Sequence, residues 1–159
     1  MSYPIIFEQC IKVILRHEGG YVNNPNDWGG ETKYGIAKRF FPELDIKNLT
    51  IEEAKRIYFD YYWTPMNLTG IIIPENILEI FDMGVNAGRS NAIRMAQRLV
   101  GSQPDGKMGP LTTKKINSFP DFLKKYKQAR VEYYMRVSMK RNNKVFLKGW
   151  LNRVSTTYF

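Results

Sequence analysis

Apolar residues near the start of the chain recur at helical spacing. Phe7, Ile11 and Ile14 lie three or four positions apart, which predicts an amphipathic helix over about residues 5–17. The glycine pair that begins at Gly19 is a typical helix stop signal. We therefore expect the first helix to end just before this pair.

The segment after the first helix is dominated by turn-forming residues. Asn, Pro, Asp and Gly fill most of residues 21–31, so we expect an irregular loop or a short hairpin there. From Thr32 the pattern predicts a second helix that runs to about Phe40. Strong strand-like alternation is absent outside residues 20–31.

Capping residues and prolines mark the starts of the later helices. Thr50 with Glu53 three positions on is a capping box. Further helices are expected to begin at Pro74, after a Ser90 cap, at Pro110 and at Pro120, with a last short helix near residues 145–154. The fold class is therefore mainly α, with at most a small β-hairpin near residues 20–31. A chain of 159 residues is expected to form a single compact domain over residues 1–159.

The chain is strongly basic. Lys and Arg number 24 against 15 Asp and Glu, which gives a formal net charge of +9 and a pI of about 9.6. Such a surface attracts polyanions, among them nucleic acid, anionic lipid and the bacterial cell wall. Since no arginine-rich run, zinc-finger spacing or RNA-binding aromatic signature accompanies the charge, we expect no nucleic-acid partner.

The cysteine and histidine content and the N-terminal segment bear on disulfides, metal sites and membrane spans. Cys10 is the sole cysteine and His17 the sole histidine, so we expect no intramolecular disulfide, no metal site and no cofactor. The segment "MSYPIIFEQCIKVILRHEGG" has no basic leader, and polar residues interrupt its apolar run. We therefore expect synthesis in the cytoplasm without a signal peptide, and no integral membrane span.

Two carboxylates near the first glycine pair are candidates for acid–base chemistry. Position 18 continues the apolar stripe of the first helix, so the Glu18 carboxylate is expected to be partly desolvated and to favour its protonated form. Asp27 lies in a polar loop and is expected to stay ionised. Two carboxylates in opposed environments are the arrangement used for glycoside hydrolysis. The Thr32 hydroxyl is placed to hold a water molecule.

A structural interpretation of the same residues stays open on spacing alone. Glu18 is also consistent with a solvated helix end, Asp27 with a turn former and Thr32 with a helix N-cap. Spacing therefore does not choose between chemistry and structure.

The motif "HEGGYVNNPNDWGGETKYGI" resembles the signature of glycoside hydrolase family 108, the bacterial and phage N-acetylmuramidases. The resemblance implies that Glu18 is the catalytic acid. The order Glu, Asp, Thr is also similar to the catalytic set of phage-type lysozymes, which implies catalytic roles for Asp27 and Thr32. The matching positions are His17, Glu18, Gly19, Gly20, Tyr21, Asp27, Gly29, Gly30, Thr32, Gly35 and Ile36.

The resemblance also suggests residues that bind substrate. Tyr21 belongs to the motif, and Trp28, which stands where the family usually has proline, is expected to stack on a sugar. The segments "FDMGVNAGRSNAIRMAQRLVG" and "DGKMGPLTTKKI" resemble a predicted peptidoglycan-binding region. Asn86 in the first of them is expected to line the saccharide cleft. The resemblance thus implies a catalytic lobe over residues 1–85 and a wall-binding lobe over residues 86–159.

Together these features predict a lysozyme-like peptidoglycan hydrolase. It would cleave the β-1,4 bond between N-acetylmuramic acid and N-acetylglucosamine, with peptidoglycan glycan strands as its partner and with the chain as a monomer. Action on the wall after holin-dependent release fits a phage endolysin, and export by another route fits equally well. Two alternatives stay open: a lytic transglycosylase, and a non-catalytic wall-binding or secretion-accessory protein.

Overall fold

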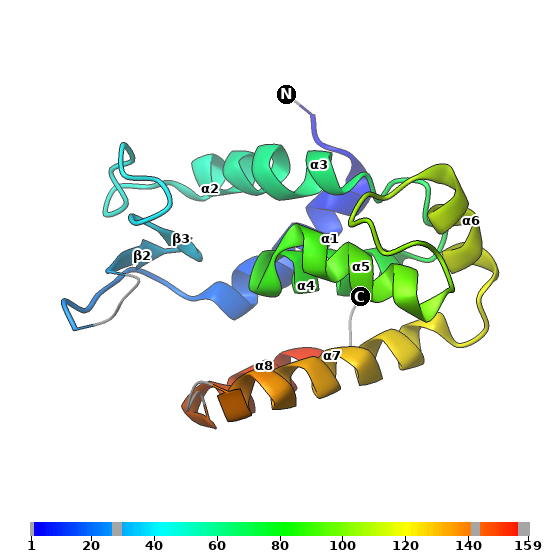
Figure 1. Ribbon diagram of the computed structural model, residues 1–159. Helices are drawn as coiled ribbons and strands as arrows, with labels where there is room; N and C mark the ends of the chain where they lie inside the picture. Colours follow the sequence, from blue (N-terminus) through cyan, green and yellow to red (C-terminus); the bar gives the residue numbers. More distant parts are fainter. Residues whose placement is uncertain (1, 27–29, 141–143, 156–159) are drawn as a thin grey trace. The chain divides into compact units, whose positions relative to one another are not determined.

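The computed structural model describes residues 2–26, 30–140 and 144–155, and these are mainly helical (Figure 1). The chain forms two compact units, Met1–Tyr61 and Tyr62–Phe159. The mainly α fold class predicted from the sequence is confirmed.

Helix α1, Ile5–Glu18, supplies the core of the first unit. The expected helix and its stop signal are confirmed, because α1 ends at Glu18 and Gly19 follows with φ 63° and ψ −176°. Only glycine adopts that backbone conformation readily. The side chains that α1 buries lie on the predicted stripe: Phe7, Cys10, Ile11, Val13 and Ile14.

A small antiparallel sheet follows α1. Its strands are β1, β2 and β3, in that order across the sheet, with bounds Val22–Asn23, Glu31–Lys33 and Ile36–Ala37. The helix expected from Thr32 to Phe40 is wrong, because Thr32 lies at the centre of β2, opposite Val22 on one side and Ala37 on the other. The β structure therefore extends past residue 31, the limit set by the sequence pattern.

A two-residue turn explains why the chain pairs with itself here instead of forming a helix. Lys33 pairs with Ile36, and the intervening Tyr34 and Gly35 have φ values of 51° and 76°. Positive φ at both central positions is the geometry of a type I′ turn, whose twist suits an antiparallel hairpin. A helix cannot continue through two residues in this conformation.

Helix α2, Ile51–Tyr58, completes the first unit. The predicted capping box is confirmed: the Thr50 hydroxyl accepts a hydrogen bond from the Glu53 amide at 3.2 Å, and the Glu53 carboxylate accepts one from the Thr50 amide at 2.8 Å. A π-helical segment, Phe59–Trp63, and the short helix α3, Thr64–Met66, follow along the chain.

The second unit is a helical bundle whose expected elements are present. Helix α4 begins at Pro74 and α6 at Pro110 as predicted, whereas α5 begins one residue before Ser90, with Gly88 in the cap position, so the predicted Ser90 cap is wrong. In the bundle α4 packs on α5, and α7 contacts α4, α5 and α8. The bounds are Pro74–Ala87 for α4, Arg89–Leu99 for α5, Pro110–Ser118 for α6, Phe122–Lys140 for α7 and Lys144–Ser155 for α8.

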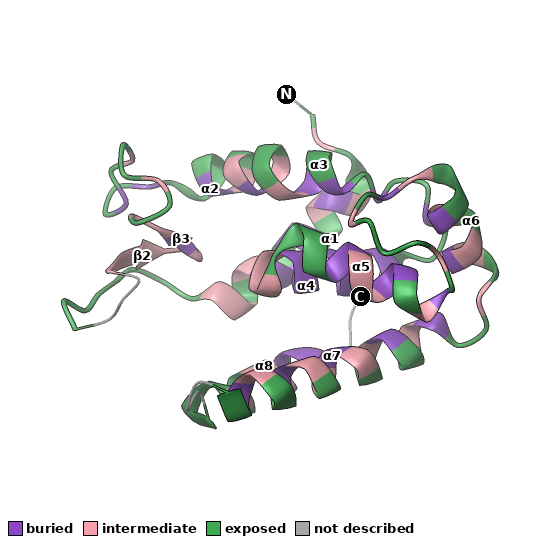
Figure 2. Cartoon of the chain, viewed as in Figure 1, coloured by how far each residue is buried: buried purple, intermediate pink, exposed green. Residues whose placement is uncertain are grey.

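Helix α4 is the central helix of this bundle. Every residue from Asn76 to Gly84 is buried, including the charged residues Glu79 and Asp82 (Figure 2). A helix that is buried on all sides needs neighbours on all sides, and its charged groups need partners of opposite charge.

Two arginines neutralise these buried carboxylates. Arg130 of α7 reaches Glu79 at 2.5 Å and Asp82 at 2.6 Å, and Arg153 of α8 reaches Asp82 at 2.8 Å. Burial opposes ionisation of Asp82, but the two guanidinium groups outweigh burial and lower the pKa of its carboxyl. The ion pairs of this buried cluster therefore tie α7 and α8 to α4.

Removing the Asp82 charge should destabilise the fold, because the arginines paired with it would stay buried without their counter-charge. Because the pKa of Asp82 is lower in the folded chain, its ionised form stabilises the fold above about pH 4, the ordinary value for aspartate, and that contribution is lost as the pH falls through the folded value. We expect Asp82→Asn to lower the free energy of unfolding by about 3–5 kcal/mol near pH 7. The difference from wild type should shrink on acidification, as measured by denaturant unfolding followed by circular dichroism.

Asp121→Asn is the matched control, because Asp121 is exposed and its positive φ of 55° suits asparagine. Equal losses in the two variants would contradict a stabilising role for the cluster. A loss with Asp82→Asn that stays constant down to pH 2 would show that its charge is irrelevant.

Candidate functional site

The Glu18 carboxylate lies directly against the β2–β3 turn. Glu18 is the last residue of α1 and is half-buried. A Cβ atom placed on Gly35 would lie 2.8 Å from Glu18 Oε2 and 2.9 Å from Glu18 Cδ. Any other residue at position 35 would therefore collide with the carboxylate, so glycine is required both by its φ value and by this close approach.

Tyr58 holds the other side of the same turn. Its side chain is buried, and its hydroxyl donates a hydrogen bond to the Tyr34 carbonyl oxygen at 2.8 Å. The same hydroxyl also occupies the space that a Cβ on Gly35 would need. The ends of α1 and α2 thus meet at the Tyr34–Gly35 turn, and the fold fixes the Glu18 carboxylate there.

Thr32 lies in the same hairpin as this turn. It occupies β2, two residues before Tyr34, and is partly exposed. Since no helix begins at this position, the interpretation of Thr32 as an N-cap is wrong. Asp27 and Trp28 lie outside the described residues, so their predicted roles stay predictions.

A tyrosine that directly precedes β1 forms a hydrogen bond with a glutamate of β2. The exposed Tyr21 hydroxyl donates a hydrogen bond to Glu31 Oε1 at 2.9 Å, and this hydrogen bond raises the pKa of the Tyr21 phenol. Sequence reasoning did not single out Glu31. Successive side chains on a strand alternate, so Glu31 and Thr32 face opposite sides of the sheet. The helix predicted from Thr32 did not indicate this arrangement.

Asn86, the remaining predicted substrate-binding residue, belongs to the second unit. Its side-chain amide donates to the Tyr134 hydroxyl at 2.7 Å, and Arg130 donates to the same hydroxyl at 3.2 Å. Asn86 is therefore connected through Tyr134 to the buried cluster around Arg130. Sequence reasoning missed this connection, since nothing in local spacing relates α4 to a tyrosine 48 positions later.

Charge is divided unevenly between the two units. Tyr62–Phe159 contains sixteen Lys and Arg against six Asp and Glu, a formal net charge of +10, whereas Met1–Tyr61 contains eight against nine. The excess positive charge of the chain therefore lies entirely in the second unit, and the unit that contains Glu18 is nearly neutral.

The described residues contain neither a metal-binding group nor a membrane-spanning helix. Within residues 2–26, 30–140 and 144–155, no three or more His, Cys, Asp and Glu side chains are grouped so as to hold a metal ion. In the same part of the chain, no helix has the length and apolar character needed to cross a bilayer.

Comparison with known protein families divides the chain in two. The family model of Glycosyl hydrolase 108 matches residues 11–88, and that of the Predicted Peptidoglycan domain matches residues 91–155. The first match contains Glu18, the hairpin and Asn86, and the second contains α6, α7 and α8. No curated protein sequence matches the chain.

A solved structure agrees with these matches over nearly the full length. "Structure of Brucella abortus SagA" is 26% identical in sequence, covers 94% of this chain and 89% of its own, and superposes with a TM-score of 0.80. The sequence motif, the two family matches and this shared fold identify the chain as a member of glycosyl hydrolase family 108 that also carries the predicted peptidoglycan domain.

Proposed function

We propose that this peptidoglycan hydrolase is an N-acetylmuramidase in which Glu18 is the general acid. It would cleave the β-1,4 bond between N-acetylmuramic acid and N-acetylglucosamine, the lysozyme reaction. The observation that carries the proposal is the position of the Glu18 carboxylate, which is half-buried and held against the Tyr34–Gly35 turn. A carboxylic acid fixed by the backbone is well suited to donate a proton to one particular oxygen.

The proposed chemistry uses one proton donor and one water molecule. Glu18 gives its proton to the bridging oxygen as the bond from that oxygen to the anomeric carbon of N-acetylmuramic acid breaks. Asp27 stabilises the positive charge that develops on the sugar or accepts the proton of the attacking water, and Thr32 positions that water. The products are two sugar ends, one of which is a reducing N-acetylmuramic acid.

Three residues are proposed to bind substrate: Tyr21, Trp28 and Asn86. Tyr21 directly precedes β1, and its hydroxyl donates a hydrogen bond to Glu31 of β2. Trp28 would stack on a sugar ring. Asn86 would offer its amide oxygen to the glycan, because its amide nitrogen is already bound to Tyr134.

The charge division supports action on the cell wall. Peptidoglycan and its associated polymers are anionic, so the second unit, with its net charge of +10, would concentrate the enzyme at the wall. We further propose that the protein acts as a monomer, after synthesis in the cytoplasm and release to the wall, with a phage holin as one route.

The first test removes the acid. Glu18→Gln keeps the shape of the side chain but cannot supply the proton, so we expect the rate of release of reducing sugars from purified sacculi to fall by about 100- to 10,000-fold. Glu43→Gln is the matched control, since Glu43 is an exposed glutamate of the same unit. Wild-type rates with Glu18→Gln would reject the assignment.

Product masses distinguish hydrolysis from lytic transglycosylation. Hydrolysis adds water across the bond, whereas a transglycosylase leaves an anhydro-muramic end that is lighter by one water molecule. We expect mass spectrometry of digested sacculi to find reducing N-acetylmuramic ends, and Asp27→Asn to slow their formation. Anhydro ends, with activity retained in Asp27→Asn, would favour the transglycosylase.

The second test addresses the turn that positions the acid. Gly35→Ala introduces a methyl group where the Glu18 carboxylate and the Tyr58 hydroxyl lie, so we expect activity on sacculi to fall by at least about tenfold at temperatures where the variant is folded. Gly101→Ala imposes similar backbone strain, because its φ is 67°, but its added methyl group would meet no atom within 4 Å.

We expect Gly101→Ala to lose about 1–2 kcal/mol of stability while it keeps its activity per folded molecule. If both alanine variants lose the same fraction of activity, contact with the turn does not position Glu18. Thermal unfolding of each variant separates loss of fold from loss of catalysis.

A further inference from the structure

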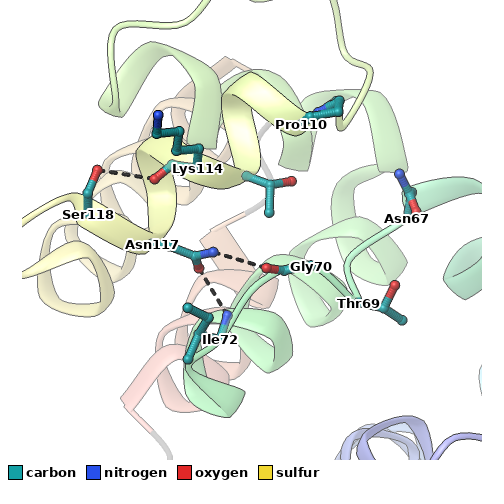
Figure 3. A pocket seen from close by; sticks show the side chains of 10 residues that line it. Asn67, Thr69, Gly70, Ile72, Pro110, Lys114, Asn117 and Ser118 are labelled. Atoms are coloured by element: carbon teal, nitrogen blue, oxygen red, sulfur yellow. Dashed lines mark hydrogen bonds between the residues drawn. The ribbon is translucent and has the colours of Figure 1, made fainter.

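The second unit contains a groove whose lining residues have no role in the proposed catalytic mechanism. Its volume is about 690 Å³, within the range of about 300–1,000 Å³ that is usual for sites of small ligands. One wall is the chain between α3 and α4, and the other is helix α6 (Figure 3). The groove is lined by Asn67, Thr69, Gly70, Ile72, Gly109, Pro110, Thr113, Lys114, Asn117 and Ser118.

The two walls are joined by hydrogen bonds at the floor. The Asn117 side chain accepts a hydrogen bond from the Ile72 amide at 2.9 Å and donates one to the Gly70 carbonyl oxygen at 3.0 Å (Figure 3). At one end, the Asn67 side chain donates to the Met108 carbonyl oxygen at 3.1 Å. Hydrogen bonds within the protein therefore hold the two walls of the groove together.

A close approach between the walls also requires glycine. A Cβ atom placed on Gly70 would lie 2.9 Å from the methyl carbon of Thr113. A larger residue at position 70 would require the Thr113 side chain to shift, so glycine allows the two walls to approach closely here.

The lining of the groove combines one lysine with apolar and uncharged polar groups, which favours an acidic ligand. None of the lining residues is acidic or aromatic, and Lys114 is the cation among them. Within the described part of the chain, the Lys114 ammonium forms no ion pair or hydrogen bond. Ile72 is 76% exposed, so an apolar side chain at the groove is also open to contact.

We propose that this groove binds the acidic stem peptide of peptidoglycan, with Lys114 paired to a peptide carboxylate. The inference rests on the proposed function, since it takes peptidoglycan as the substrate. Thr69 and Thr113 would hydrogen-bond to peptide amides, and Ile72 would contact the methyl group of an alanine. A stem peptide fits better than a sugar ring, because the lining has no aromatic face on which a ring could stack.

Charge and family membership agree with this ligand. The unit that contains the groove has a net charge of +10, which complements a peptide with several carboxylates. Helix α6 lies within the match to the Predicted Peptidoglycan domain, whereas Asn67 to Ile72 lie within the match to Glycosyl hydrolase 108. The groove would therefore join peptide recognition to the catalytic half of the sequence.

The test measures binding to purified sacculi, which avoids any dependence on turnover. All proteins carry Glu18→Gln so that the glycan stays intact, and each is titrated against untreated sacculi and against the peptide-free glycan strands that an amidase releases from sacculi. Lys114→Glu should raise the Kd for untreated sacculi by about tenfold or more relative to its control, because it removes at least one charge-assisted hydrogen bond. For peptide-free glycan strands it should behave like the control.

Lys124→Glu is the matched control, because Lys124 is an exposed lysine on α7 outside the groove and the net charge changes by the same amount. Equal weakening by Lys114→Glu and Lys124→Glu would overturn the proposal in favour of general electrostatic attraction. Unequal weakening that persists on peptide-free glycan strands would overturn it in favour of glycan as the occupant.

A second variant tests the groove without altering charge. Thr69 is exposed on one wall, so Thr69→Trp should fill the space without disturbing the core. We expect it to weaken binding to untreated sacculi selectively, with an unchanged melting temperature. Normal binding by a folded Thr69→Trp protein would exclude the groove as the site.

Failure of the proposed function can be distinguished from failure of this inference. If the protein with Glu18 intact cleaves no glycosidic bond but binding still depends on Lys114, the muramidase proposal fails and the groove stands. If cleavage depends on Glu18 while binding ignores both Lys114 and Thr69, the groove proposal fails and the muramidase stands.

Discussion

The contact between the Glu18 carboxylate and the Tyr34–Gly35 turn is the constraint on which the first unit depends. The Glu18 carboxylate occupies space that a side chain at position 35 would need, and Gly35 leaves that space free. The type I′ turn in turn sets the register of β2 with β3, and the Tyr58 hydroxyl holds the turn through the Tyr34 carbonyl. One glycine thus joins hairpin geometry, the end of α2 and the position of the candidate acid.

The second unit depends on a different balance, between desolvation and charge pairing. Buried carboxylates on α4 would oppose folding if they lacked partners, but Arg130 and Arg153 supply them from α7 and α8. The arrangement is costly to break and specific in its geometry, because each guanidinium group must meet a carboxylate on the buried face of α4. Through Tyr134 the same cluster also orients Asn86, at the end of α4.

The two units differ strongly in net charge. The first unit, which contains Glu18, is nearly neutral. The second unit holds the entire excess of positive charge, and exposed charges act over only about 8 Å at physiological salt. Attraction to an anionic wall is therefore a property of the second unit.

The sequence by itself determined most of the helices, the end of α1 at Glu18 and the family motif. Helical spacing, glycine stops, prolines and the Thr50–Glu53 capping box are local signals, and local signals survive without knowledge of the fold. Only the tertiary structure decided that Thr32 lies in a strand, that Gly35 makes room for a carboxylate, and that Arg130 meets Asp82. Each of these depends on residues brought together from distant parts of the chain, where packing overrides local propensity and no spacing rule applies.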